Sequence, residues 1–185
     1  MNEVVALDTN CLAMLSSPRE GDKLNRARLE HLLDEVGKAG GRIIIPAPVF
    51  AEFLVGINEA ASEWINEFDK RRHVLVAPFD RRAAFECSLL DKAALNTGDK
   101  KGGRPEPWQR IKVDRQIVAV AKVCQVTTIV TNDGGVRATA MTAGLIVRRL
   151  EELPLPDSAR QHGLFQPTET RTKAAARRMI LPPAA

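Results

Sequence analysis

The fold is decided by a short apolar segment near the start of the chain, Val4-Val5-Ala6-Leu7, which ends directly in Asp8. Four more short segments rich in Val and Ile follow, separated by stretches in which apolar residues recur at helical spacing. This alternation is typical of a parallel sheet with crossover helices, and strands of this length can be buried completely. Working outward from the first segment, we expect strands at residues 4–8, 42–46, 74–77, 127–131 and 145–150.

Helical spacing predicts helices at residues 22–38, 48–57, 59–70, 81–95 and 113–123. Glycines and prolines break the pattern between residues 96 and 107, and a second break, Pro154-Leu155-Pro156, follows the last strand. We therefore expect one α/β domain at residues 1–153, which contains a basic loop at 96–113. A basic C-terminal extension at 154–185, with a short helix near 169–179, would follow it.

The composition is that of a soluble globular protein. The 185 residues suffice for one domain, and contents of 44% hydrophobic and 27% charged residues argue against disordered, collagen-like and disulfide-rich classes. Apolar runs stay short of the roughly 20 residues that a membrane span needs. The first residues lack the basic region of a signal peptide, so we expect a cytoplasmic protein. The three cysteines and three histidines are too scattered for a disulfide framework or a zinc site.

Two acidic residues stand directly after expected strands. Asp8 follows the first strand, and Asp133 follows the fourth in the segment Thr131-Asn132-Asp133. Ligands of open parallel sheets bind beyond the carboxyl ends of the strands, where the strand order reverses. If the first and fourth strands are neighbours, these two carboxylates converge. The alternative is that each aspartate only caps the helix after it, a role that Asp fills well.

Two further acids are placed close to the same edge. Glu52 lies in an apolar helical segment, and a buried unpaired charge would be costly, so its side chain is expected to face a cation or a polar site. Asp114 is expected to open the helix at 113–123, whose apolar face includes Ile117 and Val118. The alternatives are an exposed position for Glu52 and, for Asp114, an interaction with the helix dipole in the first turn.

A cluster of these four acids needs a counter-charge. Two ionised carboxylates about 5 Å apart repel each other by roughly 3 kcal/mol at an effective dielectric constant near 20. With oxygen ligands alone, Mg²⁺ or Mn²⁺ is favoured over zinc. A site of this kind suits the hydrolysis of phosphodiester bonds, in which metal ions activate water and stabilise the leaving oxygen.

At these residues the chain resembles the PIN-domain nucleases, and especially the VapC-like toxins of bacterial toxin-antitoxin pairs. The resemblance extends from residue 1 to about residue 150 and consists of four motifs in the family's order. They are Leu7-Asp8-Thr9-Asn10 at the end of the first strand, Val49-Phe50-Ala51-Glu52-Phe53 on a helix, residues 114–121, and Thr131-Asn132-Asp133 after a buried strand.

The resemblance implies a three-layer α/β/α fold around a central five-stranded parallel sheet. It also implies a Mg²⁺- or Mn²⁺-dependent endoribonuclease that forms a homodimer and is inhibited by a small antitoxin protein. The catalytic and metal-binding residues would be Asp8, Glu52, Asp114 and Asp133, with Asn10 and Thr131 as polar neighbours that orient them. Many family members carry a further acid two residues beyond the last one, where this chain has Gly135.

The distribution of charge suggests a polyanionic partner. The formal net charge is only +4, but residues 99–115 and 157–185 each carry a net +3, which leaves the remaining residues net negative by two. Basic residues close to Asp114 are therefore expected to hold RNA phosphates near the acids. Trp108 could stack on an unpaired base or, alternatively, pack on its own domain. The expected substrate-binding residues are Lys100, Lys101, Arg104, Trp108, Arg110, Lys112 and Arg115.

These observations favour a metal-dependent endoribonuclease, the toxin of a type II toxin-antitoxin pair. The alternatives are a nuclease of housekeeping RNA processing and a PIN-like module that binds RNA without cutting it. The second is disfavoured because a pure binder gains nothing from acids that face phosphate. A phosphatase of the haloacid-dehalogenase type is disfavoured as well, since its second Asp would stand where this chain has Asn10.

Overall fold

The structure of the chain is a computed structural model that describes residues 3–16, 20–57, 61–157 and 159. Within these residues, five strands form one parallel sheet in the order β3-β2-β1-β4-β5. Each strand lies within two residues of its expected bounds. The strands are β1 (Val4–Leu7), β2 (Arg42–Pro46), β3 (Val74–Ala77), β4 (Thr128–Val130) and β5 (Ile146–Arg148).

The strand order reverses at β1. The chain builds β2 and β3 on one side of β1 and then returns to build β4 and β5 on the other side. In the register, Val5 lies opposite Ile43 of β2 and opposite Thr128 of β4. The expectation that the first and fourth strands are neighbours is therefore confirmed, and their carboxyl ends meet at the same edge of the sheet.

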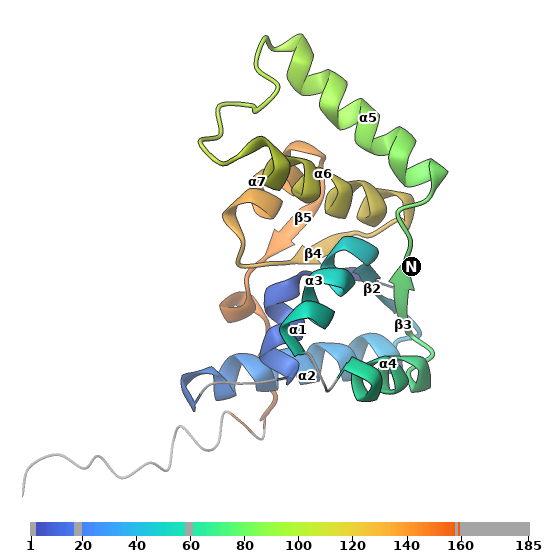
Figure 1. The fold of residues 1–185 in the computed structure, drawn as a ribbon. Coiled ribbons are helices and arrows are strands. Elements are labelled where there is room, and N and C mark those ends of the chain that lie inside the picture. Colours follow the sequence, from blue (N-terminus) through green and yellow to red (C-terminus); the bar gives the residue numbers. More distant parts are fainter. Residues whose placement is uncertain (1–2, 17–19, 58–60, 158, 160–185) are drawn as a thin grey trace, which may run out of the picture.

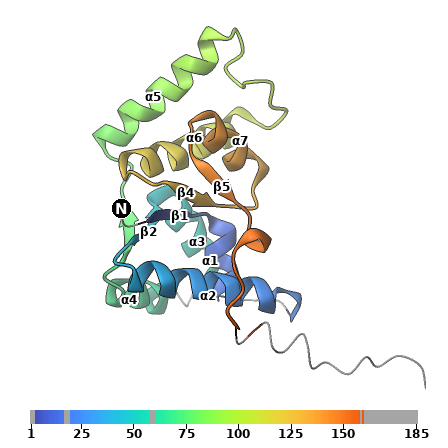
Figure 2. The same ribbon diagram turned by 180° about the vertical axis from the view of Figure 1, so that it is seen from behind.

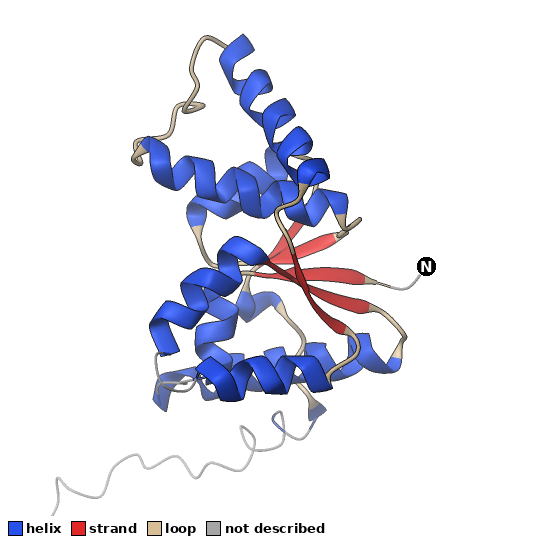
Figure 3. Cartoon of the chain, turned by 45° about the vertical axis from the view of Figure 1, so that its right-hand side comes forward, coloured by secondary structure: helices blue, strands red, loops and turns tan. Residues whose placement is uncertain are grey.

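Helices cover both faces of the sheet and give the expected three-layer α/β/α fold. Helices α6 and α7 lie on one side and α2 and α4 on the other (Figures 1 and 2), with the sheet between the two helical layers (Figure 3). Helix α5 packs along α6 at the outside of the molecule. The helices are α1 (Thr9–Ser16), α2 (Lys23–Lys38), α3 (Ala47–Ile57), α4 (Ala61–Lys70), α5 (Arg81–Asn96), α6 (Trp108–Val123) and α7 (Gly134–Thr142), with short 3-10 turns at Glu20–Asp22 and Leu150–Glu152.

The core lies where the central strands face the two helical layers. Val5, Ala6 and Leu7 of β1 are fully or almost fully buried, as are the isoleucines of β2. Burial of strands on both faces explains why their sequences are continuous apolar runs rather than alternating patterns. The expectation of complete burial fails for the two edge strands, where Leu75 in β3 and Ile146 in β5 are exposed among the described residues.

Some helix bounds differ from those expected. Helix α6 begins at Trp108 rather than near residue 113, so the loop after α5 covers only residues 97–107. Helices α1 and α7 are short, and their sequences carry little helical periodicity; α7 even opens with two glycines. Residues 160–185, which hold most of the expected basic extension and its helix near 169–179, lie outside the described residues. None of the described helices is long and apolar enough to span a membrane.

Candidate active site

All four predicted acids line one cleft at the carboxyl edge of the sheet. Its volume is about 640 Å³. The acids reach it from four different elements, because Asp8 follows β1, Glu52 lies on α3, Asp114 lies on α6 and Asp133 follows β4. Asn10, the predicted polar neighbour, lines the same cleft. The remaining lining residues are Thr9, Pro48, Arg110, Val113, Ile117 and Val136.

Asp8 is the most deeply placed of the acids that follow strands. Its backbone amide still donates to the carbonyl of Val130 in β4, so the end of the β1–β4 ladder fixes its position. The carboxylate accepts hydrogen bonds from the Thr9 amide (2.8 Å) and from the Thr131 hydroxyl (2.6 Å). Burial raises the pKa of Asp8; these two hydrogen bonds oppose the shift, and the negative charges of Asp133 and Glu52 add to it.

Thr131 connects the two acids that follow strands. Its side chain is completely buried, and while its hydroxyl donates to Asp8, its oxygen accepts from the backbone amide of Asp133 (2.9 Å). The predicted orienting role of Thr131 matches this geometry. The hydroxyl holds the ends of β1 and β4 together through one buried link.

Asp133 both caps a helix and faces the cleft. Its Oδ1 accepts from the amides of Gly135 and Val136 in the first turn of α7, while its Oδ2 pairs with Arg110 at 2.6 Å. Burial alone would raise the pKa of Asp133, but the two amides and the Arg110 guanidinium outweigh burial and hold it below its ordinary value. The capping role and the cleft position, set out as alternatives for this residue, therefore occur together.

Glu52 lies on the exposed side of α3, at the mouth of the cleft. Helix α3 begins directly after β2, as expected, so its first turns stand at the carboxyl edge of the sheet. Oε2 of Glu52 accepts a hydrogen bond from the Thr9 hydroxyl at 2.7 Å. The residue that follows Asp8 thus orients the glutamate of a helix 43 positions away.

Asp114 lies in the middle of α6 and not in a first turn, because this helix begins five residues earlier than its apolar pattern indicates. The suggested interaction with the helix dipole is therefore wrong. The carboxylate is buried and pairs with Arg104 at 2.5 Å. Burial raises the pKa of Asp114, and the Arg104 guanidinium lowers it without cancelling the effect of burial.

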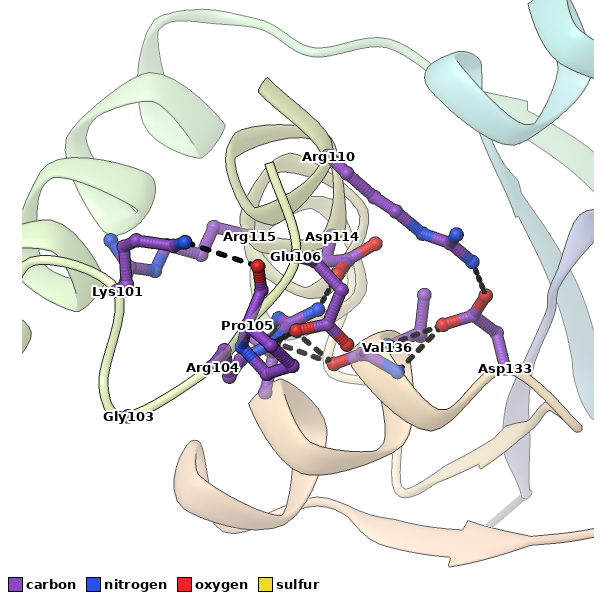
Figure 4. A network of polar contacts seen from close by, with 12 residues as sticks. Lys101, Gly103, Arg104, Pro105, Glu106, Arg110, Asp114, Arg115, Asp133 and Val136 are labelled. Atoms are coloured by element: carbon purple, nitrogen blue, oxygen red, sulfur yellow. Dashed lines mark hydrogen bonds and ion pairs between the residues drawn. The ribbon is translucent and has the colours of Figure 1, made fainter. Parts of the chain in front are cut away.

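Arg104, in the loop between α5 and α6, reaches the carboxylate of Asp114 (Figure 4). Besides Asp114, its guanidinium contacts the carbonyl of Gly135 (3.3 Å), the hydroxyl of Thr139 (3.2 Å) and the carboxylate of Glu106 (3.4 Å). The loop residue is thus bound to both α6 and α7. Its predicted phosphate contact remains a prediction, and the guanidinium is committed to protein groups in this conformation.

The other predicted substrate-binding residues differ in exposure, and the half-buried Lys101 donates its ammonium to the carbonyl of Pro105 at 3.2 Å. Lys100, Arg110 and Lys112 are exposed. Arg115, by contrast, is buried: it pairs with Asp91 at 2.6 Å and donates to the carbonyl of Lys100 at 2.7 Å. The Trp108 ring lies 5.2 Å from the ammonium of Lys100 and 5.3 Å from the guanidinium of Arg115. Trp108 thus contacts two cations of its own domain, and its stacking on a base stays a prediction.

A model of the PIN domain matches residues 5–141 of the chain. The chain belongs to the PIN-domain family. Members of this family are generally nucleases that use divalent metal ions. The expectation drawn from the four motifs is thereby confirmed at the level of the family.

Solved structures share the fold of this PIN domain. They include VapBC2 from Rickettsia felis bound to a DNA fragment from their promoter (17% identity, TM-score 0.53, 79% of this chain and 98% of that chain covered). DNA-bound VapBC from Salmonella typhimurium matches with 18% identity, a TM-score of 0.52, and 81% and 99% covered. VapBC-1 from nontypeable Haemophilus influenzae matches with 18% identity, a TM-score of 0.53, and 80% and 98% covered. No curated protein sequence matches the chain.

The carboxylates of the PIN domain suit a divalent cation by their chemistry. All four offer hard oxygen donors, the ligands that Mg²⁺ and Mn²⁺ prefer. In the described part of the chain, however, no group of three or more Asp, Glu, His or Cys side chains is arranged so that it could hold a metal ion. Asp114 and Asp133 each direct an oxygen at an arginine instead. The oxygen donors are of the kind that binds such an ion, but two of the four carboxylates are arranged around the guanidinium groups of arginines.

Thr9 contributes to the PIN-domain site, although the sequence pattern predicted no role for it. It donates its amide to Asp8 and its hydroxyl to Glu52, so it positions two acids at once. Its place between Asp8 and Asn10 in the first motif was the available signal. The two arginine–aspartate pairs carried no such signal, since Arg104 and Asp114 are ten residues apart with two prolines between them.

Proposed function

We propose that this PIN domain is a Mg²⁺- or Mn²⁺-dependent endoribonuclease and the toxin of a type II toxin-antitoxin pair. The observation that carries the proposal is the convergence of Asp8, Glu52, Asp114 and Asp133 on one cleft from four elements. Four carboxylates in one cleft repel an anionic substrate unless cations lie between the carboxylates and the substrate. Membership of the PIN family supports nuclease chemistry at the same residues.

Different residues of the cleft would bind the cation, orient the acids and contact the RNA. The four acids would hold the divalent ion, which when bound activates water and stabilises the negative charge that develops on the phosphodiester. Thr131 and Thr9 keep Asp8 in one orientation, and Thr9 does the same for Glu52. The exposed side chains of Lys100 and Lys112 are available to RNA phosphates, which would position the strand over the acids without reading its sequence; Arg110 is exposed as well but pairs with Asp133.

The toxin assignment rests on a separate observation. The structural neighbours are VapBC complexes, and the matched region of this chain spans almost the whole of each neighbouring chain. We infer that a small antitoxin protein binds this chain as well. Housekeeping RNA processing would use the same acids, so the two functions differ in partner and not in chemistry.

The nuclease proposal is tested by the cleavage of RNA with Mg²⁺, with Mn²⁺ and with a chelator. Asp8→Asn should lower cleavage by at least about 100-fold, because the variant loses a carboxylate of the cation site while keeping the side chain's shape. Asp34→Asn removes an equal charge from an exposed position on α2 and should cleave as the wild type does. Cleavage that persists in Asp8→Asn or in chelator contradicts the proposal, and RNA binding without any cleavage favours the binding module.

The toxin proposal has its own readout. Expression of the chain should arrest bacterial growth, and the co-expressed product of a small neighbouring reading frame should relieve the arrest. If the wild type cleaves RNA in vitro but neither effect occurs, housekeeping RNA processing is the better assignment.

A further inference from the structure

An arginine of the chain itself, Arg104, holds one of the acids that line the cleft. The side chain of Arg104 is only 14% exposed and that of its partner Asp114 only 6%, so this ion pair is largely removed from water. Exposed ion pairs of similar geometry contribute little to stability, but a pair this buried is screened much less by solvent and salt. The guanidinium is therefore a strong local charge at one of the four acids.

The pair fits its place because residue 135 is a glycine. A Cβ atom at Gly135 would collide with Nη2 of Arg104 and with Oδ2 of Asp114, the two atoms that form the ion pair. The Gly135 carbonyl also accepts a hydrogen bond from Nη1 of Arg104. The first turn of α7 thus provides both the space and an acceptor for the guanidinium.

The loop that carries Arg104 is itself held in place. The carboxylate of Asp99 accepts from the amides of Lys101 (2.8 Å) and Gly103 (2.6 Å), which closes a turn just before Arg104. The buried Arg115 donates to the carbonyl of Lys100 and ties this turn to α6. These contacts fix the segment that carries Arg104, and Figure 4 shows Arg104 beside Asp114.

We propose that Arg104 is an internal counter-ion, which competes with a divalent cation for the carboxylate of Asp114. The inference rests on the proposed function only in that the cleft takes such a cation. Oδ2 of Asp114 accepts from Nη2 of Arg104, and a cation that binds this oxygen has to displace the guanidinium and overcome its repulsion. In the metal-free protein, Arg104 neutralises Asp114; when the cation binds, the two positive charges exclude each other at this carboxylate.

The test is the affinity of the full chain for Mn²⁺, measured by isothermal titration calorimetry without RNA. Arg104→Gln should bind Mn²⁺ on the order of tenfold more tightly than the wild type, because no charge-assisted hydrogen bond has to be broken first. The same variant should unfold at a lower temperature when metal-free, since Asp114 loses its partner. Arg26→Gln removes an equal charge from an exposed pair with Glu30 on α2 and should change neither value.

Unchanged or weaker Mn²⁺ binding by a folded Arg104→Gln overturns the inference. If that variant does not fold, Arg104→Lys serves instead: it keeps the charge but loses the planar fork that joins Asp114 to Gly135 and Thr139, and it should still bind Mn²⁺ more tightly than the wild type. Equal or weaker affinity in the lysine variant also overturns the inference.

The outcomes separate this inference from the proposed function. If Arg104→Gln binds Mn²⁺ more tightly but no variant cleaves RNA, the proposed role of Arg104 is supported and the proposed nuclease function is refuted. Mn²⁺-dependent cleavage by the wild type without tighter binding by the variant refutes the counter-ion alone. The absence of Mn²⁺ binding in every variant refutes both.

Discussion

The two sides of the acid cleft hold their carboxylates by different means. On the side formed by β1, β4, α1 and α3, Asp8 and Glu52 accept hydrogen bonds from the neutral groups of Thr9 and Thr131. On the side formed by α6 and α7, Asp114 and Asp133 each pair with an arginine. Neutral donors orient a carboxylate but leave its charge in the cleft, whereas a guanidinium cancels that charge.

The pKa values of the acids follow this difference only in part. Burial and the neighbouring charges of Asp133 and Glu52 raise the pKa of Asp8, which marks an acid short of positive charge. The helix-capping amides and Arg110 hold the pKa of Asp133 below its ordinary value in spite of burial. The pKa of Asp114 is nevertheless raised, because burial outweighs the effect of Arg104, so the arginine side compensates the charge of Asp133 more fully than that of Asp114.

The largest expected effect comes from breaking the neutral side at Thr131. Thr131→Val keeps the shape of the side chain but leaves a buried oxygen of Asp8 and the amide of Asp133 without their partner. Two buried groups that lose a hydrogen bond should together cost about 3 kcal/mol in the free energy of unfolding, measured by urea denaturation.

The matched control for this variant is Thr142→Val on α7. Its hydroxyl bonds only to the carbonyl of Ala138 and is exposed, so the change should stay within about 0.5 kcal/mol. Equal costs for the two variants would show that the buried link between β1 and β4 adds nothing to stability.

Asp8→Asn is expected to have a smaller effect on stability than Thr131→Val, and to stabilise the metal-free protein rather than destabilise it. The pKa of Asp8 lies above its ordinary value of 3.8 in the folded chain, so the folded chain loses stability as the pH rises from about 4 through the raised pKa. Asparagine cannot ionise, and the variant should therefore unfold roughly 2 to 4 °C above the wild type at pH 7.

The pH dependence is the check on this second effect. The advantage of Asp8→Asn should disappear below about pH 4, where both forms are neutral at this position. A variant that is less stable than the wild type at pH 7 would mean that the charge of Asp8 is already compensated, and the contrast between the two sides of the cleft would be lost.

The smallest effect is expected at the exposed arginine. The Arg110 side chain is 59% exposed and its partner Asp133 is 19% exposed, so Arg110→Gln should cost only about 0.5 kcal/mol at low salt. The difference from the wild type should shrink further in 1 M NaCl, because salt screens exposed pairs. A cost above about 2 kcal/mol, or one that salt leaves unchanged, would place Arg110 with Arg104 as a built-in partner of the acids.

Much of the site was predictable because its acids are tied to local patterns. An Asp at the end of an apolar run stands at the carboxyl edge of a parallel sheet wherever the run forms a strand, and this holds for Asp8 and Asp133. The beginning of α6 was not predictable in the same way. Residues 108–112 are mostly polar or charged, so the apolar pattern starts late, and the helix extends through them as its first turns.

The sequence by itself determined the five strands, their parallel sheet and the edge at which Asp8 and Asp133 stand, since apolar runs and the residues that end them are local features; the three-layer fold was implied by the resemblance to PIN domains. Only the tertiary structure decided which charge each acid meets. Whether Thr131 bridges Asp8 and Asp133, and whether Arg104 reaches Asp114 over Gly135, depends on how segments from distant parts of the chain pack together. Hydrogen bonds and ion pairs of this kind act over about 3 Å and need a defined geometry, which no spacing along the chain specifies.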